Sequence, residues 1–144
     1  MGTLKVQGFD ELDAAFRRIA DIPDEVKSDA LVSMAQVAAE KIKASGEAMG
    51  VRDPESEMHI LDKITLTKPK LSEAGGSIDI TFSGSRTRGE TRTRNAEIAF
   101  INEYGKRNQP ARPFIGTAMT KNEEAIAGPG ADVLWDWVEK DFLK

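Results

Sequence analysis

The feature that most constrains the fold is a long amphipathic segment that begins near Asp21. Asp21 can accept hydrogen bonds from the free amides of a first helical turn, and Pro23 is tolerated there because its amide would be unpaired anyway. Gly46 and Gly50 offer places to stop. Apolar residues recur at helical spacing between these ends, at Val26, Ala30, Met34, Val37, Ala38 and Ile42. The pattern predicts one long helix with an apolar stripe that another layer must cover, and a short helix is expected before it, from Asp10.

Two short segments downstream show the two-residue alternation of half-buried strands. Ile64 and Leu66 alternate with threonines, and Ile78, Ile80 and Phe82 alternate with polar residues. The stretch between the two segments is interpreted as a plain connection. We expect the strands to pair antiparallel against the long helix. The predicted fold class is therefore α+β: a small antiparallel sheet packed by a long helix, in a single domain spanning residues 1–144, with further short helices toward the C-terminus.

The segment 96–104 allows two interpretations. Asn95 in front of it and Gly105 behind it are start and stop signals for a short helix. The alternation of Ile98 and Phe100 is equally compatible with a strand. Both remain open at the level of sequence.

The last part of the chain is expected to be helical. A helix is predicted to begin at Pro113, and residues 128–130, Gly-Pro-Gly, are expected to break it before a final helix that reaches Phe142. Trp135 and Trp137 point about 200° apart on such a helix, so both cannot face one core. Trp137 is the one expected to contact another subunit.

Residues 83–94 hold no large apolar side chain and are predicted to form a mobile loop or a solvated hairpin. Four arginines in this segment share an even register, which in an extended chain would place them on one face: Arg86, Arg88, Arg92 and Arg94. Arginine pairs well with both phosphates and carboxylates. The segment is therefore expected to contact an acidic neighbouring subunit or DNA, or else to remain solvated. Aromatic residues that would stack on bases do not interleave with the arginines.

Composition excludes several kinds of chemistry. The chain has no cysteine, which removes disulfides, thiolate nucleophiles and zinc–cysteine centres. His59 is the only histidine, and the spacing of the nearby acids at positions 53, 55 and 57 matches no metal-binding loop. Glycine-rich phosphate-binding motifs are absent. We therefore expect no catalytic residue, no cofactor and no metal site.

Charge and hydropathy limit the partners. The net charge of −4 disfavours binding of nucleic acid by the molecule as a whole. No apolar run of about eighteen residues is available to span a membrane. Residues 1–10 lack the basic and apolar regions of a signal peptide, so synthesis in the cytoplasm is expected.

Two adjoining stretches form a motif. Residues 96–105 read Ala-Glu-Ile-Ala-Phe-Ile-Asn-Glu-Tyr-Gly, and residues 109–118 read Gln-Pro-Ala-Arg-Pro-Phe-Ile-Gly-Thr-Ala. An aromatic-rich segment ending in Glu-aromatic-Gly, followed by Pro-Ala-Arg-Pro-Phe and a helix, resembles the signature of the minor tail or tail-completion proteins that join head to tail in siphophage-like bacteriophages and prophages. The upstream order of a short helix, a long helix and two strands resembles that family as well.

The resemblance implies a structural protein of the virion, made in the cytoplasm of a bacterial host and without enzymatic activity. Its partners would be phage neck, connector or tail-tube proteins, with DNA close by, no membrane, and a homo-oligomer in the assembled particle. The residues expected to bind partners are Glu103, Tyr104, Arg112, Phe114, Trp137 and the four arginines named above. A nucleic-acid-binding regulator that uses Arg86–Arg94 is the alternative.

The motif also has a direct physical interpretation. Pro110 and Pro113 stiffen a short extended arm at low entropic cost and hold Arg112 between them. Glu103 and Arg112 are expected to form an ion pair that locks the turn around Gly105. The arm is then either a local folding clip or a docking edge for a neighbouring subunit, and the sequence leaves both open.

Overall fold

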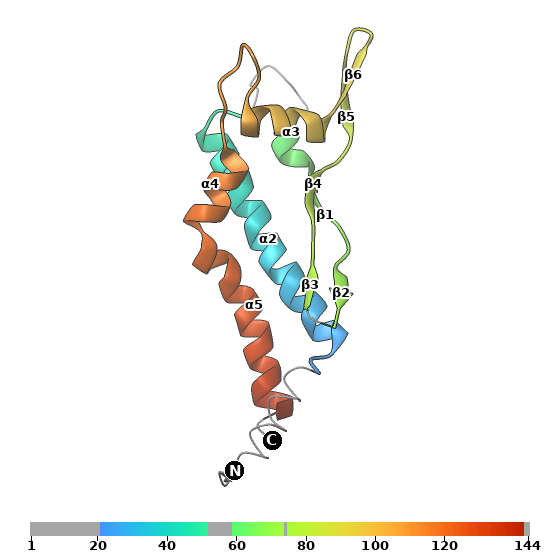
Figure 1. The fold of residues 1–144 in the computed structure, drawn as a ribbon, viewed down its shortest axis with the longest axis vertical. Helices are drawn as coiled ribbons and strands as arrows, with labels where there is room; N and C mark the ends of the chain where they lie inside the picture. Colours follow the sequence, from blue (N-terminus) through green and yellow to red (C-terminus); the bar gives the residue numbers. More distant parts are fainter. Residues whose placement is uncertain (1–20, 52–58, 74, 143–144) are drawn as a thin grey trace, which may run out of the picture.

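The computed structural model describes residues 21–51, 59–73 and 75–142. One long helix, α2 (Asp24–Ala48), forms the spine, with paired strands along one side and two helices along the other (Figure 1). A shorter helix, α3 (Asn95–Tyr104), crosses one end of the spine beside a projecting hairpin (Figure 1). The predicted α+β class, with a long helix packed on small antiparallel sheets, is confirmed.

The start of α2 differs in detail from the prediction. Pro23 occupies the N-cap position, and no side chain caps the first turn, so the expected cap by Asp21 is wrong. Asp24 and Glu25 lie in the first turn instead. Their carboxylates favour this end of the helix because the unpaired amides give it partial positive charge.

The end of α2 is a Schellman motif at Gly50. The Val51 amide donates to the Gly46 carbonyl at 2.8 Å and the Gly50 amide to Glu47 at 3.2 Å, with Gly50 at φ 74°. Gly50 is therefore the stop that was predicted. Gly46 is not, since it lies inside the helix, and an added Cβ there would approach Leu61 Cδ2 to 2.5 Å. Gly46 lets the core come close to the helix backbone.

The two predicted strands form and pair as expected. A 3-10 turn over Ile60–Lys63 leads into β1 (Ile64–Leu66), which runs antiparallel to β4 (Ile80–Phe82) with Thr65 opposite Thr81. The apolar members of both strands face inward toward α2, as the alternation requires.

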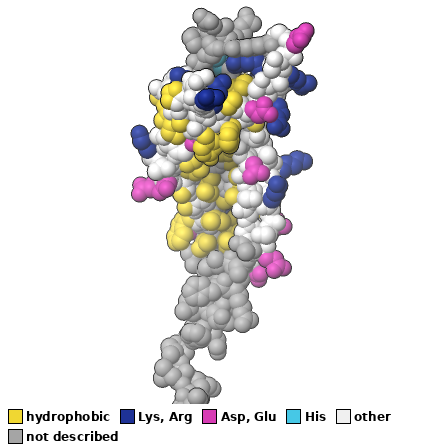
Figure 2. All heavy atoms as spheres, turned by 45° about the horizontal axis from the view of Figure 1, so that its top comes forward, with side chains coloured by type: hydrophobic (Ala, Val, Ile, Leu, Met, Phe, Trp, Pro, Cys, Tyr) yellow, Lys and Arg dark blue, Asp and Glu magenta, His cyan; other side chains and the backbone are white. Residues whose placement is uncertain are grey.

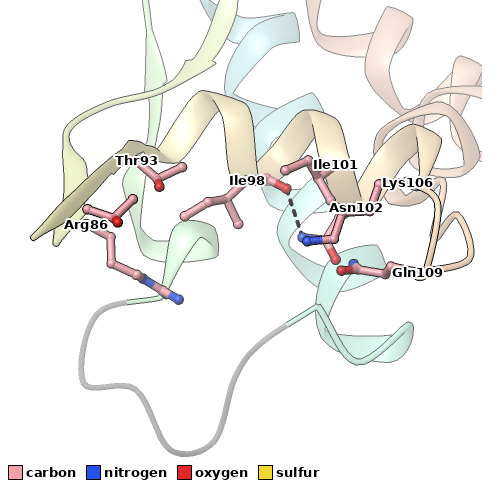
Figure 3. A pocket seen from close by; sticks show the side chains of 8 residues that line it. Arg86, Thr93, Ile98, Ile101, Asn102, Lys106 and Gln109 are labelled. Carbon is pink, nitrogen blue, oxygen red and sulfur yellow. Dashed lines mark hydrogen bonds between the residues drawn. The ribbon is translucent and has the colours of Figure 1, made fainter. Parts of the chain in front are cut away.

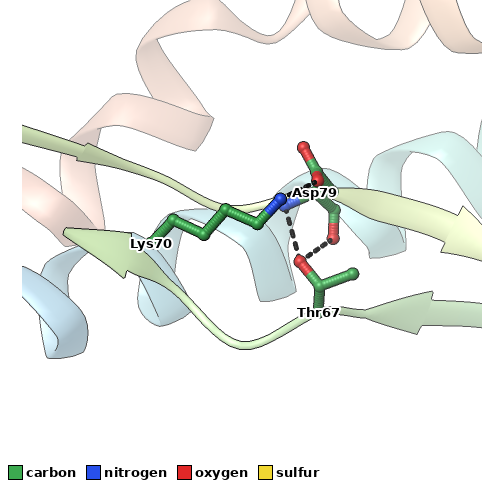
Figure 4. A network of polar contacts seen from close by, with 3 residues as sticks. All are labelled: Thr67, Lys70 and Asp79. Carbon is green, nitrogen blue, oxygen red and sulfur yellow. Dashed lines mark hydrogen bonds and ion pairs between the residues drawn. The ribbon is translucent and has the colours of Figure 1, made fainter.

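The connection between these strands is more ordered than predicted. It contains a second antiparallel pair, β2 (Lys70–Ser72) and β3 (Gly75–Ser77). Asp79 fixes the junction: its amide donates to Thr67 Oγ1 at 3.0 Å, and its carboxylate lies 3.7 Å from Lys70 Nζ (Figure 4). Glycine-rich β3 carries no apolar alternation, which is why sequence patterning missed this pair.

The C-terminal helices divide at a different place from the one predicted. Helix α4 (Phe114–Lys121) ends at Asn122, and α5 (Glu123–Trp137) follows at once and continues as a π-helical turn over Val138–Phe142. The Gly-Pro-Gly segment therefore does not break the helix. The Asn122 side chain donates to the Ala118 carbonyl at 2.8 Å, which helps to close α4.

Packing against α2 explains why α5 runs through Pro129. Gly130 is buried against the spine, and a Cβ at this position would overlap the sulfur of Met34. The missing side chain lets α5 lie close along α2, so tertiary contact outweighs the hydrogen bond that Pro129 removes.

The hydrophobic core lies at the α3 end of the molecule, where the helices and the β1–β4 sheet meet. Ile42, Leu61 and Phe114 are fully buried. Phe114 meets Phe82 edge to face, with ring centroids 6.0 Å apart. The expectation that Phe114 binds a partner is therefore wrong: at 0% exposure it is a central core residue.

Candidate functional site

Helix α3 is anchored at its first residue. The Asn95 side-chain amide donates to the Ser83 carbonyl at 2.8 Å, and its backbone amide donates to Gly84 at 3.0 Å. Asn95 is only 4% exposed, so these bonds satisfy a buried polar group. Of the two interpretations left open for residues 96–104, the helix is right, and its start is tied to the end of β4.

The inner side of α3 is fixed by Ala99 and Asn102. Ala99 is buried against the core, and Asn102 Nδ2 donates to the Ile98 carbonyl at 2.9 Å. The Asn102 carbonyl accepts the backbone amide of Arg112. The helix is thus bonded to the arm that follows it, which leaves its orientation little freedom.

The outer side of α3 carries two exposed aromatic side chains. Phe100 is 62% exposed and Tyr104 is 70% exposed, although both are large and apolar. Their rings lie side by side with centroids 4.7 Å apart and planes tilted by 49°, because residues four apart share a helix face. Ala96, one turn earlier, is also exposed. Exposed aromatics held on a rigid element are typical of binding surfaces.

Glu103 clips α3 to α4. Its carboxylate accepts the backbone amides of Ile115 at 2.8 Å and Gly116 at 2.9 Å. These are the second and third residues of α4, whose N-cap is Pro113 and supplies no capping side chain. Glu103 therefore caps α4 from another helix, and its charge also suits the positive end of that helix.

The predicted ion pair between Glu103 and Arg112 is wrong. Arg112 Nη1 donates instead to the Gly50 carbonyl at 3.0 Å, at the end of α2. Among the described residues no ion pair joins Arg112 to Glu103. Both side chains satisfy backbone groups at helix ends, so the motif serves as a folding clip.

Gly105 makes the turn between α3 and the arm possible. It has φ 79° and ψ 178°, a conformation open almost only to glycine. A Cβ there would lie 2.8 Å from Ala111 N and 2.9 Å from Gln109 O. The Gln109 carbonyl in turn accepts the Lys106 amide at 2.9 Å. The chain passes over Gly105 at a distance that no side chain permits.

Substitution of Glu103 by alanine is expected to lower the free energy of unfolding by about 1–2 kcal/mol, since two amides of α4 lose their acceptor. Thermal unfolding measures the loss. Glu97→Ala is the matched control, because the contact of Glu97 among the described residues is an exposed ion pair with Arg94 at 2.9 Å, and its loss should change stability by less than about 0.5 kcal/mol. Equal effects of the two substitutions would contradict the capping role.

The arginine-rich segment is an antiparallel hairpin. Strand β5 (Ser85–Arg88) pairs with β6 (Thr91–Arg94) through a two-residue turn in which Gly89 has φ 61°. The hairpin projects beyond the end of α3 (Figure 1). Of the two forms predicted, the structure has the hairpin.

The arginines do not share one face. Arg86 pairs with Thr93, whereas Arg92 pairs with Thr87. Side chains of directly opposed residues point to the same side of a sheet, so Arg86 lies opposite to Arg92. A two-residue turn places each even-numbered residue of one strand opposite an odd-numbered residue of the other. Even-numbered arginines on the two strands therefore lie on opposite faces of the hairpin. Arg88 pairs with Thr91 next to the turn.

Arg92 and Arg94 contact neighbouring side chains of the same chain. Arg92 Nε donates to Ser85 Oγ at 2.7 Å, and Arg94 binds Glu97 Oε1 through Nε at 3.1 Å and Nη2 at 2.9 Å. The Arg94 pair joins the base of the hairpin to the first turn of α3. This exposed ion pair links the hairpin to the helix that carries Phe100 and Tyr104.

A hollow of about 450 Å³ lies between the hairpin, α3 and the turn over residues 106–109 (Figure 3). Ile98 and Ile101 line it on the helix side, and Arg86 and Lys106 line it on the other sides. Its apolar helix side and cationic rim are compatible with an acidic side chain from a partner.

Two further residues singled out in the sequence lie outside this surface. Trp135 is 58% exposed and its indole nitrogen donates to Glu139 at 2.7 Å, whereas Trp137 is half-buried. The exposed tryptophan on α5 is therefore Trp135, whereas the one predicted to contact a partner was Trp137. His59 is half-buried beside the 3-10 turn. The predicted short helix after Asp10 falls outside the described residues.

We call the surface formed by α3 and the hairpin the aromatic face; Phe100 and Tyr104 are its centre. Sequence patterning had assigned Phe100 to an apolar repeat without placing it at the surface. If the segment is taken as a helix, the four-residue spacing places Phe100 and Tyr104 on one face, and Ala99 and Asn102 lie on the opposite face. That spacing was the sequence signal for an exposed aromatic pair.

Metal-binding side chains do not gather in the described part of the chain. No group of three or more histidine or acidic side chains there could hold a metal ion. None of the helices in the described ranges is long and apolar enough to cross a bilayer. Comparison with protein-family models, with curated proteins and with solved structures found no match.

Proposed function

We propose that this protein is a structural subunit of a tailed bacteriophage or prophage that joins head and tail, and that it acts by binding neighbouring subunits at the neck or tail end. The resemblance of residues 96–118 to tail-completion proteins supports the family. The observation that carries the binding role is the pair Phe100 and Tyr104, exposed on a helix that is bonded at both ends.

Because α3 holds Phe100 and Tyr104 rigidly at the surface, the pair is better suited to binding a partner than to stabilising the fold. Phe100 and Tyr104 could be polar without loss to the core, because the buried side of α3 is made by Ala99 and Asn102. Aromatic residues on fixed elements lose little conformational entropy when a partner covers them, and such residues dominate the binding energy of protein interfaces. The proposal places them against an adjoining subunit.

The hairpin extends the same surface with positive charge. Lys106 lies at the rim of the hollow beside α3, where an acidic partner could contact it. In a closed ring the aromatic face of one copy would meet a different surface of the next, so each copy would have both faces occupied.

Deletion of the gene from a phage or inducible prophage tests the proposal. Electron microscopy of the lysate should show separate heads and tails, and expression of the intact protein in trans should restore joined particles. The protein should also be found in purified particles by mass spectrometry. Normal infectious particles formed without the gene would contradict the proposal.

The alternative is a nucleic-acid-binding regulator, and the projecting arginine hairpin is the feature that favours it. Binding would then occur to any duplex at low salt and weaken steeply as salt rises. Arg92 contacts Ser85 and Arg94 contacts Glu97, so these two side chains already have partners within the chain, which counts against the nucleic-acid role.

A further inference from the structure

A second surface lies along β4, away from the aromatic face. The hydrogen bonds that flank the β1–β4 pair set which backbone groups point toward β1. The Thr67 amide donates to Asp79 O at 2.9 Å, and the Ser83 amide donates to Lys63 O at 2.8 Å. In an antiparallel pair such bonded positions alternate with non-bonded ones along the strand.

This alternation determines the direction in which the backbone groups in the middle of β4 point. Thr81 lies two residues from both bonded positions, so its amide and carbonyl point toward β1. The amides and carbonyls of Ile80 and Phe82 therefore point away from β1. No strand in the described part of the chain pairs with that side of β4. The edge offers two donors and two acceptors in the plane of the sheet.

An apolar groove of about 610 Å³ runs along this edge. Ile42 of α2 contributes to its lining, and Ile115 and Met119 of α4 line the part across from β4. Met119 is 39% exposed there. In the space-filling view, hydrophobic side chains form a band down the molecule between charged side chains on either side (Figure 2).

The lining residues come from both faces of β4, with Thr67 joining them beside Asp79, so the groove includes the strand edge and is not confined to one face. Ile80 and Phe82 come from the inner face of β4, and Thr81 and Asp79 from the outer face. Ile115 and Met119 of α4 form part of the lining, so a partner that pairs with β4 must fit between this strand and the helix, which suits one extended chain better than a second sheet. A second copy of β1–β4 is therefore a poor fit.

Charge also selects the occupant. Asp79 is the only charged residue that lines the groove among the described residues, and Lys70 lies 3.7 Å from its carboxylate. A segment with uncharged apolar side chains complements such a lining, while the backbone edge requires an extended main chain.

We propose that this groove binds an extended segment of a different protein, which adds to β4 as a third strand of the β1–β4 sheet. About four residues with alternating apolar side chains would span the edge. Their main chain pairs with Ile80 and Phe82, and their apolar side chains pack on Ile115 and Met119. The site is separate from the aromatic face and does not require a role in a virion.

Hydrogen exchange followed by NMR tests the free edge first. In the isolated protein the amides of Ile80 and Phe82 should exchange at least about tenfold faster than the amide of Thr81, which is bonded to β1. Equal protection of the three amides would overturn the proposal, since the edge would then be closed to solvent and to a partner, by pairing or by burial.

A synthetic peptide with the sequence of residues 63–68, blocked at both ends, is the probe for the second step. It alternates apolar and polar residues in the way that β1 already pairs with β4. At millimolar concentration it should slow exchange at Ile80 and Phe82 by about tenfold, and a peptide of the same composition in scrambled order should not.

Two substitutions at Met119 test whether the peptide binds in the groove. Met119→Arg should abolish the effect of the peptide by placing a charge in the groove, whereas Met119→Leu should retain it, and thermal unfolding checks that both fold. Absence of any protection by the peptide, protection confined to α3, or unchanged protection with Met119→Arg would each overturn the proposal. Protection that grows with protein concentration without peptide would overturn it as well, because the occupant would then be a second copy.

Discussion

Gly105→Ala is expected to lower the free energy of unfolding by about 3 kcal/mol or more. Two effects combine at this position. A residue with a Cβ is strained at φ 79° and ψ 178°. The Cβ would also lie 2.8 Å from Ala111 N and 2.9 Å from Gln109 O, which are backbone atoms that cannot rotate away. Urea unfolding measures the loss, which is a large part of the stability of an ordinary domain.

Gly50→Ala separates these two effects. Gly50 also has positive φ, at 74°, but a Cβ there would meet nothing within 4 Å. Only the conformational strain remains, about 1–2 kcal/mol. A loss at Gly105 no larger than the loss at Gly50 would contradict the close approach of the chain over the turn.

Replacing Phe100 and Tyr104 together with serine is expected to abolish incorporation into particles while leaving the fold intact. Interface aromatics at the centre of a contact commonly contribute about 2 kcal/mol each, so the double substitution should weaken binding by roughly a hundredfold to a thousandfold. Both side chains are largely exposed, so their loss removes little core packing. Complementation of a deletion mutant measures incorporation, and thermal unfolding measures stability.

Two controls sharpen this test. Tyr104→Phe retains the ring and should retain most incorporation. Trp135→Ser removes an aromatic side chain of similar exposure on α5 and should have little effect. A double variant of Phe100 and Tyr104 that assembles normally, or one that fails only because it unfolds, would contradict a binding role for the aromatic face.

The sequence predicted the elements with strong local signals. The helical stripe of α2, the alternation in β1 and β4, and the stop at Gly50 were all found where expected. In each case the signal is local, because a helix stripe or a strand alternation follows from which residues must face one core. The class of the fold follows from these elements.

The wrong predictions concern segments whose structure depends on contacts between residues far apart in the sequence. Pro129 looks like a helix breaker from its neighbours alone, but the packing of Gly130 on Met34 holds α5 together. Phe114 lies in a polar, proline-rich stretch, yet it fills the space beside Phe82. Neither contact has a signature in the local sequence.

The sequence correctly indicated that the charged residues of the motif stabilise this region, but the partners predicted for them were wrong. Glu103 and Arg112 are oppositely charged and near in sequence, which favours a simple pair. Each instead reaches an unsatisfied helix end, Glu103 at the start of α4 and Arg112 at the end of α2. Backbone groups at helix ends compete well for charged side chains because they have no partner within the helix.

Photo-cross-linking from position 104 in assembling particles tests the central claim most directly. A photoreactive phenylalanine derivative placed there retains an aromatic ring at the centre of the aromatic face. The account predicts a covalent product, identified by mass spectrometry, that joins this protein to a neighbouring copy or to another subunit of the particle. Efficient cross-linking from position 135 on α5 together with none from position 104 would contradict it.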